Sequence, residues 1–494
     1  MSTPLKDPNK PAHAIVKVHD DGSALRNDGE VLQAANSNPW YVLATVFGEQ
    51  AEGAEIWKYN KELAAKNRRA WNGWACAGLS EVERQDRAEK VGLAVEDLKP
   101  LTKAELDEIK TRFQKRMGKM ATLPDRIEKI AFFFIYFSQY LCFEKYVFEK
   151  YANFSSSTFN GAANFSSSTF CGIANFDSST FSGEANFSSS TFNTTATFIS
   201  SRFNGVANLS LSTFSNVVYF DSSTFRYTAY FDSSRFCEGA GFSSSTFSGG
   251  TNFRLSTFGG NATFISSVFS GSADFSSAKF KSTTLFTNAK FISAVPQFHG
   301  ADMYDDTVFS LPENYLDNWP PLSDQVTVEG QEKPINVMPA ADQKRAYNRL
   351  RLFMNRALQF DEEQFFHRQE MRCKQEEAKG VHVVIFMLFD ALSDYGNSIE
   401  RPAAWLFILW IWGAIAKLNA VGGGSFWPDY HSIPHALGWS LSNLFTVFGF
   451  WRLYAKEFLE LNSWLQLIGS AQTVCGFALL FLLGLGLRNR FRLR

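Results

Sequence analysis

A large apolar residue recurs at alternating steps of five and six residues from Phe132 to Phe291, and this eleven-residue period constrains the fold more than any other feature. Phenylalanine fills every one of these positions except one, where Leu209 stands. Neither the helical period of 3.6 residues nor the strand period of two gives this spacing. A solenoid does, because each short unit forms one side of a coil and its phenylalanine points into a stacked core.

The residues between the phenylalanines fit the same geometry. Small residues such as Ala152 and Ala163 stand two places before a phenylalanine, where a second inward position leaves little room. Ser, Thr, Asn and Gly are expected on the outer faces and at the corners, where turns need permissive residues. A clean unit, Ala-Asn-Phe-Ser-Ser-Ser-Thr-Phe-Asn-Gly-Ala, runs from Ala152 to Ala162.

This unit resembles the pentapeptide-repeat family, in a Phe-rich variant with an extra residue in alternate units. The resemblance implies a right-handed quadrilateral β-helix with four units in each coil. Residues 131–295 would then form about seven coils, a rod of roughly 35 Å at the usual spacing between strands.

The borders of the rod follow from its register. The apolar stretch 131–143 is too short to span a membrane, and its phenylalanines are in phase with the repeat, so it is predicted to be the first coil. Gln297 stands where the next phenylalanine is due, which places the end of the solenoid near Ala294. Residues 296–339, rich in proline and acidic side chains, are then predicted to be a linker.

The region before the rod divides into two predicted parts. Residues 1–37 are polar and aperiodic, and we expect a mobile tail. Residues 38–130 are expected to form a small helical domain, because Ser80 to Glu83 and Thr102 to Glu105 match the capping box that begins helices. Its core candidates are Trp57, Trp71 and Trp74.

Composition argues against several classes of function. Lys and Arg number 48 against 49 Asp and Glu, and the rod mixes both signs, so no nucleic-acid partner or imitation of DNA is expected. Six cysteines lie scattered without disulfide or metal spacing, which suits a reducing compartment. His431 and His435 lie four apart near Asp429, but Pro434 disrupts the helix that a metal site of this spacing needs. We therefore expect no enzyme activity, no metal and no cofactor.

The C-terminal part, residues 401–494, is predicted to be a membrane module. Residues 464–487 carry no charge and are long enough to span, and residues 402–420 form a second span if Lys417 snorkels to the interface. The basic tail after residue 487 predicts, by the positive-inside rule, that both termini of a multi-pass membrane protein are cytoplasmic. Residues 340–400 are expected to be cytoplasmic and interfacial helices, with 381–392 lying on the membrane.

Between the predicted spans, residues 436–451 are apolar but too short to cross. The segment resembles the pore loop of two-span channels, which read Thr-Val-Gly-Tyr/Phe-Gly, although here glycine comes one position late and a phenylalanine replaces the second glycine. The resemblance implies carbonyl groups around an axis. The candidate selectivity residues are Thr446, Val447, Phe448, Gly449 and Phe450.

The second predicted span carries candidate pore-lining residues: Gln466, Ser470 and Thr473 fall on one face, and Gly476 offers a hinge below them. The order of helices, span, pore-like segment and final span over residues 340–494 resembles bacterial pentapeptide-repeat proteins with an ion-channel-like C-terminus. This resemblance implies a homo-oligomer in a bacterial inner membrane, with a tetramer favoured, that conducts a monovalent ion. The rod would then sense or dock a cytoplasmic ligand or protein. The alternative is a membrane-anchored scaffold whose Ser/Thr-covered solenoid binds a protein partner and whose short segment is an amphipathic hairpin between two anchors.

Overall fold

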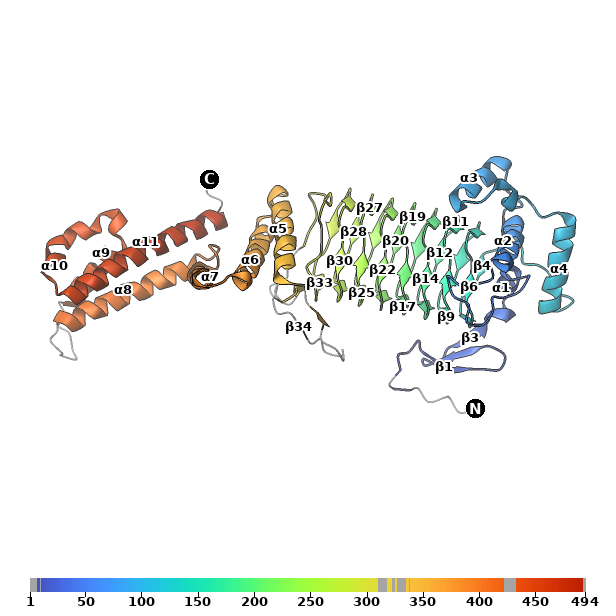
Figure 1. The fold of residues 1–494 in the computed structure, drawn as a ribbon, viewed down its shortest axis with the longest axis horizontal. Coiled ribbons are helices and arrows are strands. Elements are labelled where there is room, and N and C mark those ends of the chain that lie inside the picture. The colour runs from blue at the N-terminus through green and yellow to red at the C-terminus, as the bar shows by residue number, and fades with distance from the viewer. Residues whose placement is uncertain are drawn as a thin grey trace. The chain divides into compact units, whose positions relative to one another are not determined.

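The computed structural model describes residues 7–8, 10–309, 318–321, 325–326, 335–336, 338–421 and 432–491. These residues form two compact units, 1–363 and 364–494, drawn in Figure 1. The first unit holds an N-terminal domain, the solenoid and helix α5, and the second holds the remaining C-terminal helices.

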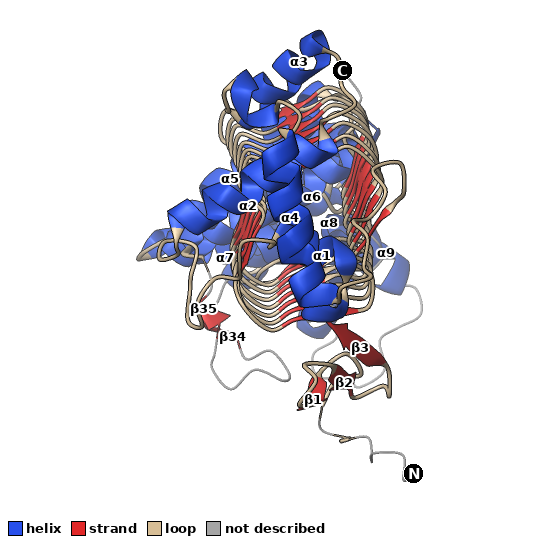
Figure 2. Cartoon of the chain, turned by 90° about the vertical axis from the view of Figure 1, so that its right-hand side faces the viewer, coloured by secondary structure: helices blue, strands red, loops and turns tan. Residues whose placement is uncertain are grey.

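The solenoid has the four-sided cross-section implied by the family resemblance, and Figure 2 shows its sheets stacked around the coil. Each side is a parallel sheet of very short strands whose partners are 22 residues apart, as for Ala163 and Ala185. The first sheet contains β5 (Ile135–Phe137), β9 (Thr158–Phe159), β13 (Thr180–Phe181), β17 (Arg202–Phe203), β21 (Thr224–Phe225), β25 (Thr246–Phe247), β29 (Val268–Phe269) and β33 (Lys290–Phe291). The second contains β4 (Ile130–Ala131), β8 (Ala152–Asn153), β12 (Ala174–Asn175), β16 (Ala196–Thr197), β20 (Val218–Tyr219), β24 (Ala240–Gly241), β28 (Ala262–Thr263) and β32 (Thr284–Leu285).

The two remaining sides have seven strands each. One contains β6 (Leu141–Cys142), β10 (Ala163–Asn164), β14 (Ala185–Asn186), β18 (Ala207–Asn208), β22 (Ala229–Tyr230), β26 (Thr251–Asn252) and β30 (Ala273–Asp274). The other contains β7 (Val147–Phe148), β11 (Thr169–Phe170), β15 (Thr191–Phe192), β19 (Thr213–Phe214), β23 (Arg235–Phe236), β27 (Thr257–Phe258) and β31 (Lys279–Phe280).

The predicted inward phenylalanines form the core. Phe154 and Phe176 stack with their ring centroids 4.7 Å apart and their planes within 1°, one coil above the other. Phe154 also meets Phe165 edge to face at 5.4 Å, so each ring combines both favourable aromatic geometries. The alanines before them, such as Ala152, are fully buried, which confirms the second inward position.

The serines between the phenylalanines are not all on the outside, contrary to the expectation from sequence. In the unit that begins at Phe154, Ser156 lies in the left-handed region, with φ 58°, and turns the chain at the corner. Ser157 beside it is fully buried. Its counterpart one coil later, Ser179, donates a hydrogen bond of 2.7 Å from Oγ to the carbonyl oxygen of Phe154. The same bond recurs at every unit from Ser157 to Ser267, so a buried hydroxyl ladder accompanies the stacked rings.

The small helical domain covers the first coil (Figure 2). Its elements are η1 (Ala35–Ser37), α1 (Pro39–Ala44), α2 (Lys61–Ala75), α3 (Glu81–Val91), η2 (Val95–Leu98) and α4 (Lys103–Met117). Both predicted capping boxes are present, at the starts of α3 and α4. Trp71 is fully buried and donates from Nε1 to the carbonyl of Val147 at 2.9 Å, and Asn72 bonds both the carbonyl of Lys145 and the amide of Val147. Trp57, a predicted core residue, is 73% exposed, so that assignment is wrong.

The predicted mobile tail, residues 1–37, instead contains three strands. They are β1 (Ile15–Val18), β2 (Ala24–Arg26) and β3 (Val31–Ala34). Strand β3 pairs in parallel with β5, with Gln33 opposite Ile135, and so extends the first sheet beyond the first coil. The edge of β5 has backbone groups that need partners, and β3 satisfies them, while Leu32 of β3 and Ala24 of β2 pack against Tyr136. Strands of three or four residues are too short to show an apolar period.

The predicted end of the rod near Ala294 is also wrong. Phe298 stacks on Phe275 at 5.0 Å, and Phe309 stacks on Phe286 at 4.8 Å. Both lie 23 residues after their partners, so one inserted residue shifts the register while the core continues. Trp319 then packs against Phe291 and Phe309 and closes this end.

The predicted linker 296–339 therefore begins with structured coil. Within its later part, the structure describes an antiparallel pair, β34 (Gln325–Val326) with β35 (Ile335–Asn336), and residues 310–317, 322–324, 327–334 and 337 lie outside the described residues. Helix α5 (Ala340–Arg356) follows and buries Tyr347, Leu350 and Met354.

Candidate functional site in the C-terminal helices

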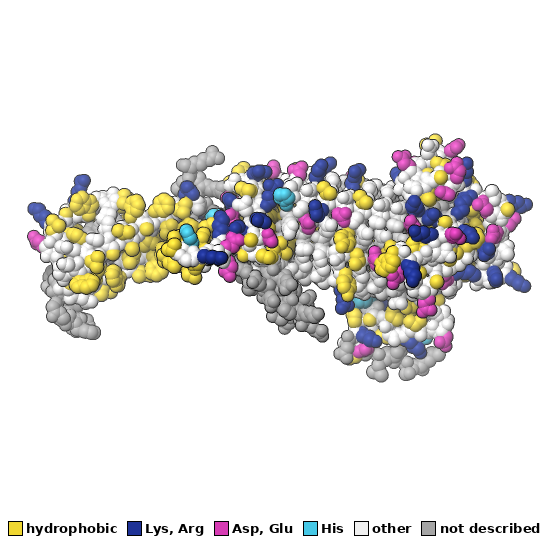
Figure 3. Space-filling view, in the orientation of Figure 1, with side chains coloured by type: hydrophobic (Ala, Val, Ile, Leu, Met, Phe, Trp, Pro, Cys, Tyr) yellow, Lys and Arg dark blue, Asp and Glu magenta, His cyan; other side chains and the backbone are white. Residues whose placement is uncertain are grey.

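Two helices of the second unit, α8 (Glu400–Val421) and α11 (Ser463–Phe491), are long and apolar enough to cross a membrane. They run side by side in Figure 1. Most of their apolar surface is not used for packing within the unit, and on the face drawn in Figure 3 hydrophobic side chains cover both helices. Among those at least 40% exposed are Trp405, Phe407, Ile408, Trp412, Ile415, Leu467, Val474, Phe477 and Phe481.

Between these helices in the sequence lies α9 (Ser432–Leu444), which packs against both of them. Leu406 of α8, Leu444 of α9 and Leu479 of α11 form a buried apolar cluster. At 13 residues, α9 is about 20 Å long, too short for a hydrocarbon core of roughly 30 Å. It is followed by η4 (Thr446–Phe448), η5 (Phe450–Leu453) and α10 (Ala455–Glu460).

A buried hydrogen-bond network fixes α9 to its neighbours. Gln472 of α11 is 1% exposed and donates from Nε2 to the carbonyl of Leu409 at 2.8 Å and to Ser440 Oγ at 2.9 Å. Asn443 donates to Oε1 of the same glutamine at 3.3 Å, and Ser440 donates to the carbonyl of Trp410 at 2.7 Å. One side chain from α11 therefore connects α8 and α9.

Glycines make these close approaches possible. A Cβ at Gly413 of α8 would lie 1.9 Å from Nε2 of Gln472, and one at Gly476 of α11 would lie 2.6 Å from the carbonyl oxygen of Leu444. Gly476 was predicted to be a hinge in a pore-lining face. In this chain it is a contact point that lets the C-terminal end of α9 touch α11.

The span at residues 402–420 was predicted on the condition that Lys417 snorkels to the interface. In the structure Lys417 is buried instead. It is 3% exposed, its amine pairs with the carboxylate of Glu457 on α10, and it lies 5.0 Å from the ring centroid of Trp439. His435 Nε2 lies 3.3 Å from the other oxygen of Glu457. A buried charge is stable in apolar surroundings only with such a partner, and Glu457 is forty residues away in sequence.

The predicted selectivity residues lie in two short 3₁₀ turns joined at Gly449. Gly449 has φ +82°, a left-handed conformation that favours glycine, and among the described residues nothing lies within 4 Å of the position its Cβ would take. In the single chain the glycine is therefore required by the turn and not by crowding. Thr446 is partly buried, whereas Val447, Phe448 and Phe450 are exposed.

The predicted pore-lining residues make different contacts within the single chain. Gln466 donates to the carbonyls of Leu459 and Leu461 and so holds the end of α10. Ser470 and Thr473 border a cavity next to α10, and Gly476 packs on α9. Gln472 and Asn443 were not predicted from the sequence, although a glutamine inside an otherwise apolar span was an available signal.

The preceding helices α6 (Phe360–Glu377) and α7 (Val381–Ser393) carry the segment expected to lie on a membrane. Val384, Ile385, Met387 and Leu388 of α7 are each more than half exposed. Beyond α7, burial raises the pKa of Tyr395 to about 12, with Asp390 adding to the shift, so this phenol is neutral when it donates to Gln375.

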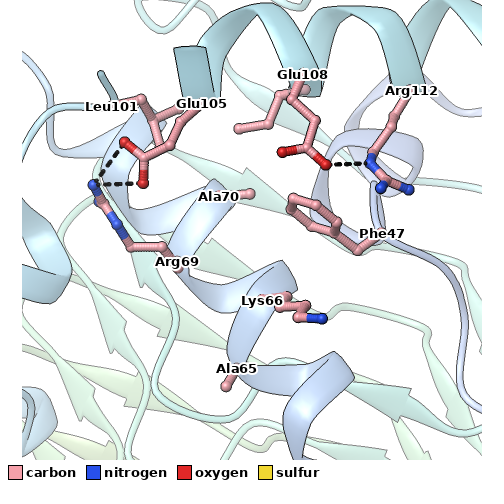
Figure 4. Close-up of a pocket in the computed structure, with 10 residues that line it drawn as sticks. Phe47, Ala65, Lys66, Arg69, Ala70, Leu101, Glu105, Glu108 and Arg112 are labelled. Carbon is pink, nitrogen blue, oxygen red and sulfur yellow. Dashed lines mark hydrogen bonds and ion pairs between the residues drawn. The ribbon is translucent and has the colours of Figure 1, made fainter. Parts of the chain in front are cut away.

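A second cavity, of about 560 Å³, lies in the N-terminal domain between α2 and α4 (Figure 4). Four of its charged side chains form ion pairs, Arg69 with Glu105 at 3.2 Å and Arg112 with Glu108 at 2.9 Å, and Lys66 also lines the cavity. Nowhere in the described ranges do three His, Cys, Asp or Glu side chains gather as metal ligands, and His431 and Asp429 lie outside those ranges.

A family model for pentapeptide repeats matches residues 143–191 and 172–213 of the chain. No curated protein and no solved structure shows a significant match. The matched residues form coils with the same register, core and buried serine as the rest of the rod. The rod of this chain is therefore a pentapeptide-repeat solenoid.

Proposed function

We propose that the C-terminal helices cross a membrane and that copies of the chain assemble around α9 and the turn Thr446–Phe450 to form a pore for a monovalent ion. The rod would then be a docking or sensing element for a cytoplasmic ligand or protein. A tetramer is the favoured assembly, as in the two-span channels that this part of the sequence resembles.

The attachment of α9 to both apolar helices is the observation that carries this proposal. A helix too short to span is stable at membrane depth only where protein buries it, and the Gln472 network supplies that burial with hydrogen bonds. The carbonyl end of α9, which carries partial negative charge, leads directly into Thr446 and would favour a cation there.

The alternative is a membrane-anchored scaffold that displays the solenoid to a protein partner. It is favoured by the geometry of Thr446–Phe450, which consists of 3₁₀ turns and not of an extended row of carbonyls. The exposed side chains of Phe448, Phe450 and Trp451 also suit the interfacial aromatic belt of an anchor.

Ion flux through liposomes that contain the full chain separates the two functions. The variant Gly449→Asn keeps the turn, because asparagine tolerates the left-handed conformation, but adds a side chain where a pore would be narrowest. We expect wild type to conduct and this variant to lose at least about tenfold in flux with unchanged oligomer size. Gly484→Ala is the matched control, since its Cβ enters open space on α11.

Wild-type protein without flux under salt, pH and voltage gradients would support the scaffold instead. Equal flux in wild type and Gly449→Asn would exclude this turn as the narrow part of the pore.

A further inference from the structure

A cavity of about 670 Å³ opens between α9, η5, α10 and the first half of α11. Its volume is in the range of sites for small organic ligands. The residues that line it are Ser442, Asn443, Thr446, Trp451, Tyr454, Ala455, Phe458, Leu459, Ser470, Thr473 and Val474.

Three of the five hydroxyl groups in this cavity, those of Ser442, Ser470 and Thr473, have already used their hydrogens. Ser442 donates to the carbonyl of Trp439 at 2.7 Å, Ser470 to that of Gln466 at 2.8 Å and Thr473 to that of Gly469 at 3.0 Å. Each oxygen therefore offers only its lone pairs to a ligand. The amide nitrogen of Asn443 donates one of its two hydrogens to Gln472, and its carbonyl oxygen is a further acceptor.

Three aromatic side chains, Trp451, Tyr454 and Phe458, form much of the remaining wall. The face of an aromatic ring carries negative charge density and attracts a cation. No Lys or Arg is among the described residues that line the cavity. The nearby amine of Lys417 is neutralised by its pairing with Glu457.

We propose that this cavity binds an organic ammonium cation with apolar substituents. Acceptor oxygens and ring faces both favour positive charge, whereas Ala455, Leu459 and Val474 favour hydrocarbon around it. An anion would meet no Lys or Arg side chain among the described lining residues. A bare metal ion would find no carboxylate among the lining residues to replace its hydration shell. The proposal holds whether or not the chain conducts ions.

Calorimetric titration of the detergent-solubilised full chain with tetrapropylammonium tests the proposal. We expect saturable binding with one site per chain. Trp451→Leu, which keeps apolar volume but removes a ring face, should weaken the affinity roughly tenfold. Trp405→Leu is the matched control, because Trp405 is an exposed tryptophan of α8 that does not line the cavity, and its affinity should equal that of wild type.

A second comparison isolates the charge. Choline should bind and its neutral isostere 3,3-dimethyl-1-butanol should not. Equal binding of the neutral compound would show a merely apolar cavity and overturn the proposal. Absence of tetrapropylammonium binding to wild type, or equal losses in Trp451→Leu and Trp405→Leu, would overturn it as well.

Discussion

Adjacent identical residues in the rod have opposite environments. Ser189 is exposed and lies in the left-handed region with φ 58°. Ser190 is fully buried and donates to the carbonyl of Phe165 at 2.7 Å. Composition predicts surface positions for both, because serine is usually exposed. Only their place in the repeat distinguishes the two serines, because the residue directly before each two-residue strand that ends in phenylalanine turns toward the core.

The first prediction follows from this difference. Ser190→Ala removes a buried donor, and we expect it to lower the free energy of unfolding by about 1–3 kcal/mol. Ser189→Ala should change it by no more than about 0.5 kcal/mol. Hydrogen exchange of peptides that cover residues 165–192 measures both locally, and equal protection in the two variants would contradict the buried role of Ser190.

The second prediction concerns the stacked rings. Phe220 lies between Phe198 at 4.7 Å and Phe242 at 5.1 Å. Phe220→Ala leaves a cavity in the core, and we expect a loss of about 3–5 kcal/mol in denaturant unfolding. Phe220→Leu should cost less than about 1.5 kcal/mol, since Leu209 already occupies an equivalent buried position. A variant Phe220→Ala as stable as wild type would show that this ring is not part of the core.

At the scale of elements, helices and strands could be predicted from the sequence where a local or periodic pattern marks them. The capping boxes at Ser80 and Thr102 are short-range patterns, and both begin helices in the structure. The strands β1–β3 have no such pattern. Strand β3 pairs with β5, and Ala24 and Leu32 pack with Tyr136 in a buried apolar cluster. The partner of Lys417 could not be found from spacing, since Glu457 approaches it only through the packing of α10.

The third prediction is a pH dependence of the N-terminal strands. Burial, together with Arg202 and Arg26, lowers the pKa of His13 to about 4. Between the unfolded value near 6.5 and about 4, the detached segment binds a proton that the attached segment does not. Attachment should therefore be fully stable above pH 6.5 and weaken as the pH falls toward 4. Hydrogen exchange at β3 measures this, and His13→Gln should remove the dependence.

The fourth prediction concerns the buried ion pair of α8 and α10. Lys417→Met leaves the carboxylate of Glu457 without its main partner, and Glu457→Gln leaves a buried amine uncompensated. Each should cost about 3–5 kcal/mol in thermal or denaturant unfolding in detergent. The double variant should be less destabilised than the sum, because no charge is then left unpaired. Additive losses would show that the two charges do not interact.

At the scale of the whole molecule, the periodic rod was predictable almost throughout, whereas its two ends were not. The period fixes register, core and sheet number because every coil repeats the same local choice. A single inserted residue before Phe298 hides the last coil from a search for strict spacing, although the ring still stacks. For the second unit, hydropathy predicts α8 and α11, but the network around Gln472 depends on which faces meet.

The fifth prediction is topological and belongs to the proposed membrane function. The positive-inside rule places α10 outside and the end of α11 in the cytoplasm. In a background with the exposed Cys237 and Cys475 replaced, an impermeant maleimide should label Lys456→Cys in intact cells. Arg490→Cys should be labelled only after permeabilisation. The reverse pattern would invert the orientation, and labelling of both without permeabilisation would show that α11 does not cross the membrane.

The 22-residue pairing of the coils has an evolutionary consequence. Because Thr180 pairs with Arg202 in the same way as with Thr158, an in-frame duplication or deletion of one whole coil leaves every junction compatible. The rod would change its length by roughly 4.8 Å per event, and both closing structures, at Trp71 and at Trp319, would meet the same surfaces as before. A change of half a coil would rotate one end of the rod relative to the other, so that a closing structure would meet the opposite side of its coil. The gene can therefore vary the length of this domain in whole-coil steps, and unequal recombination between near-identical repeats supplies such steps readily.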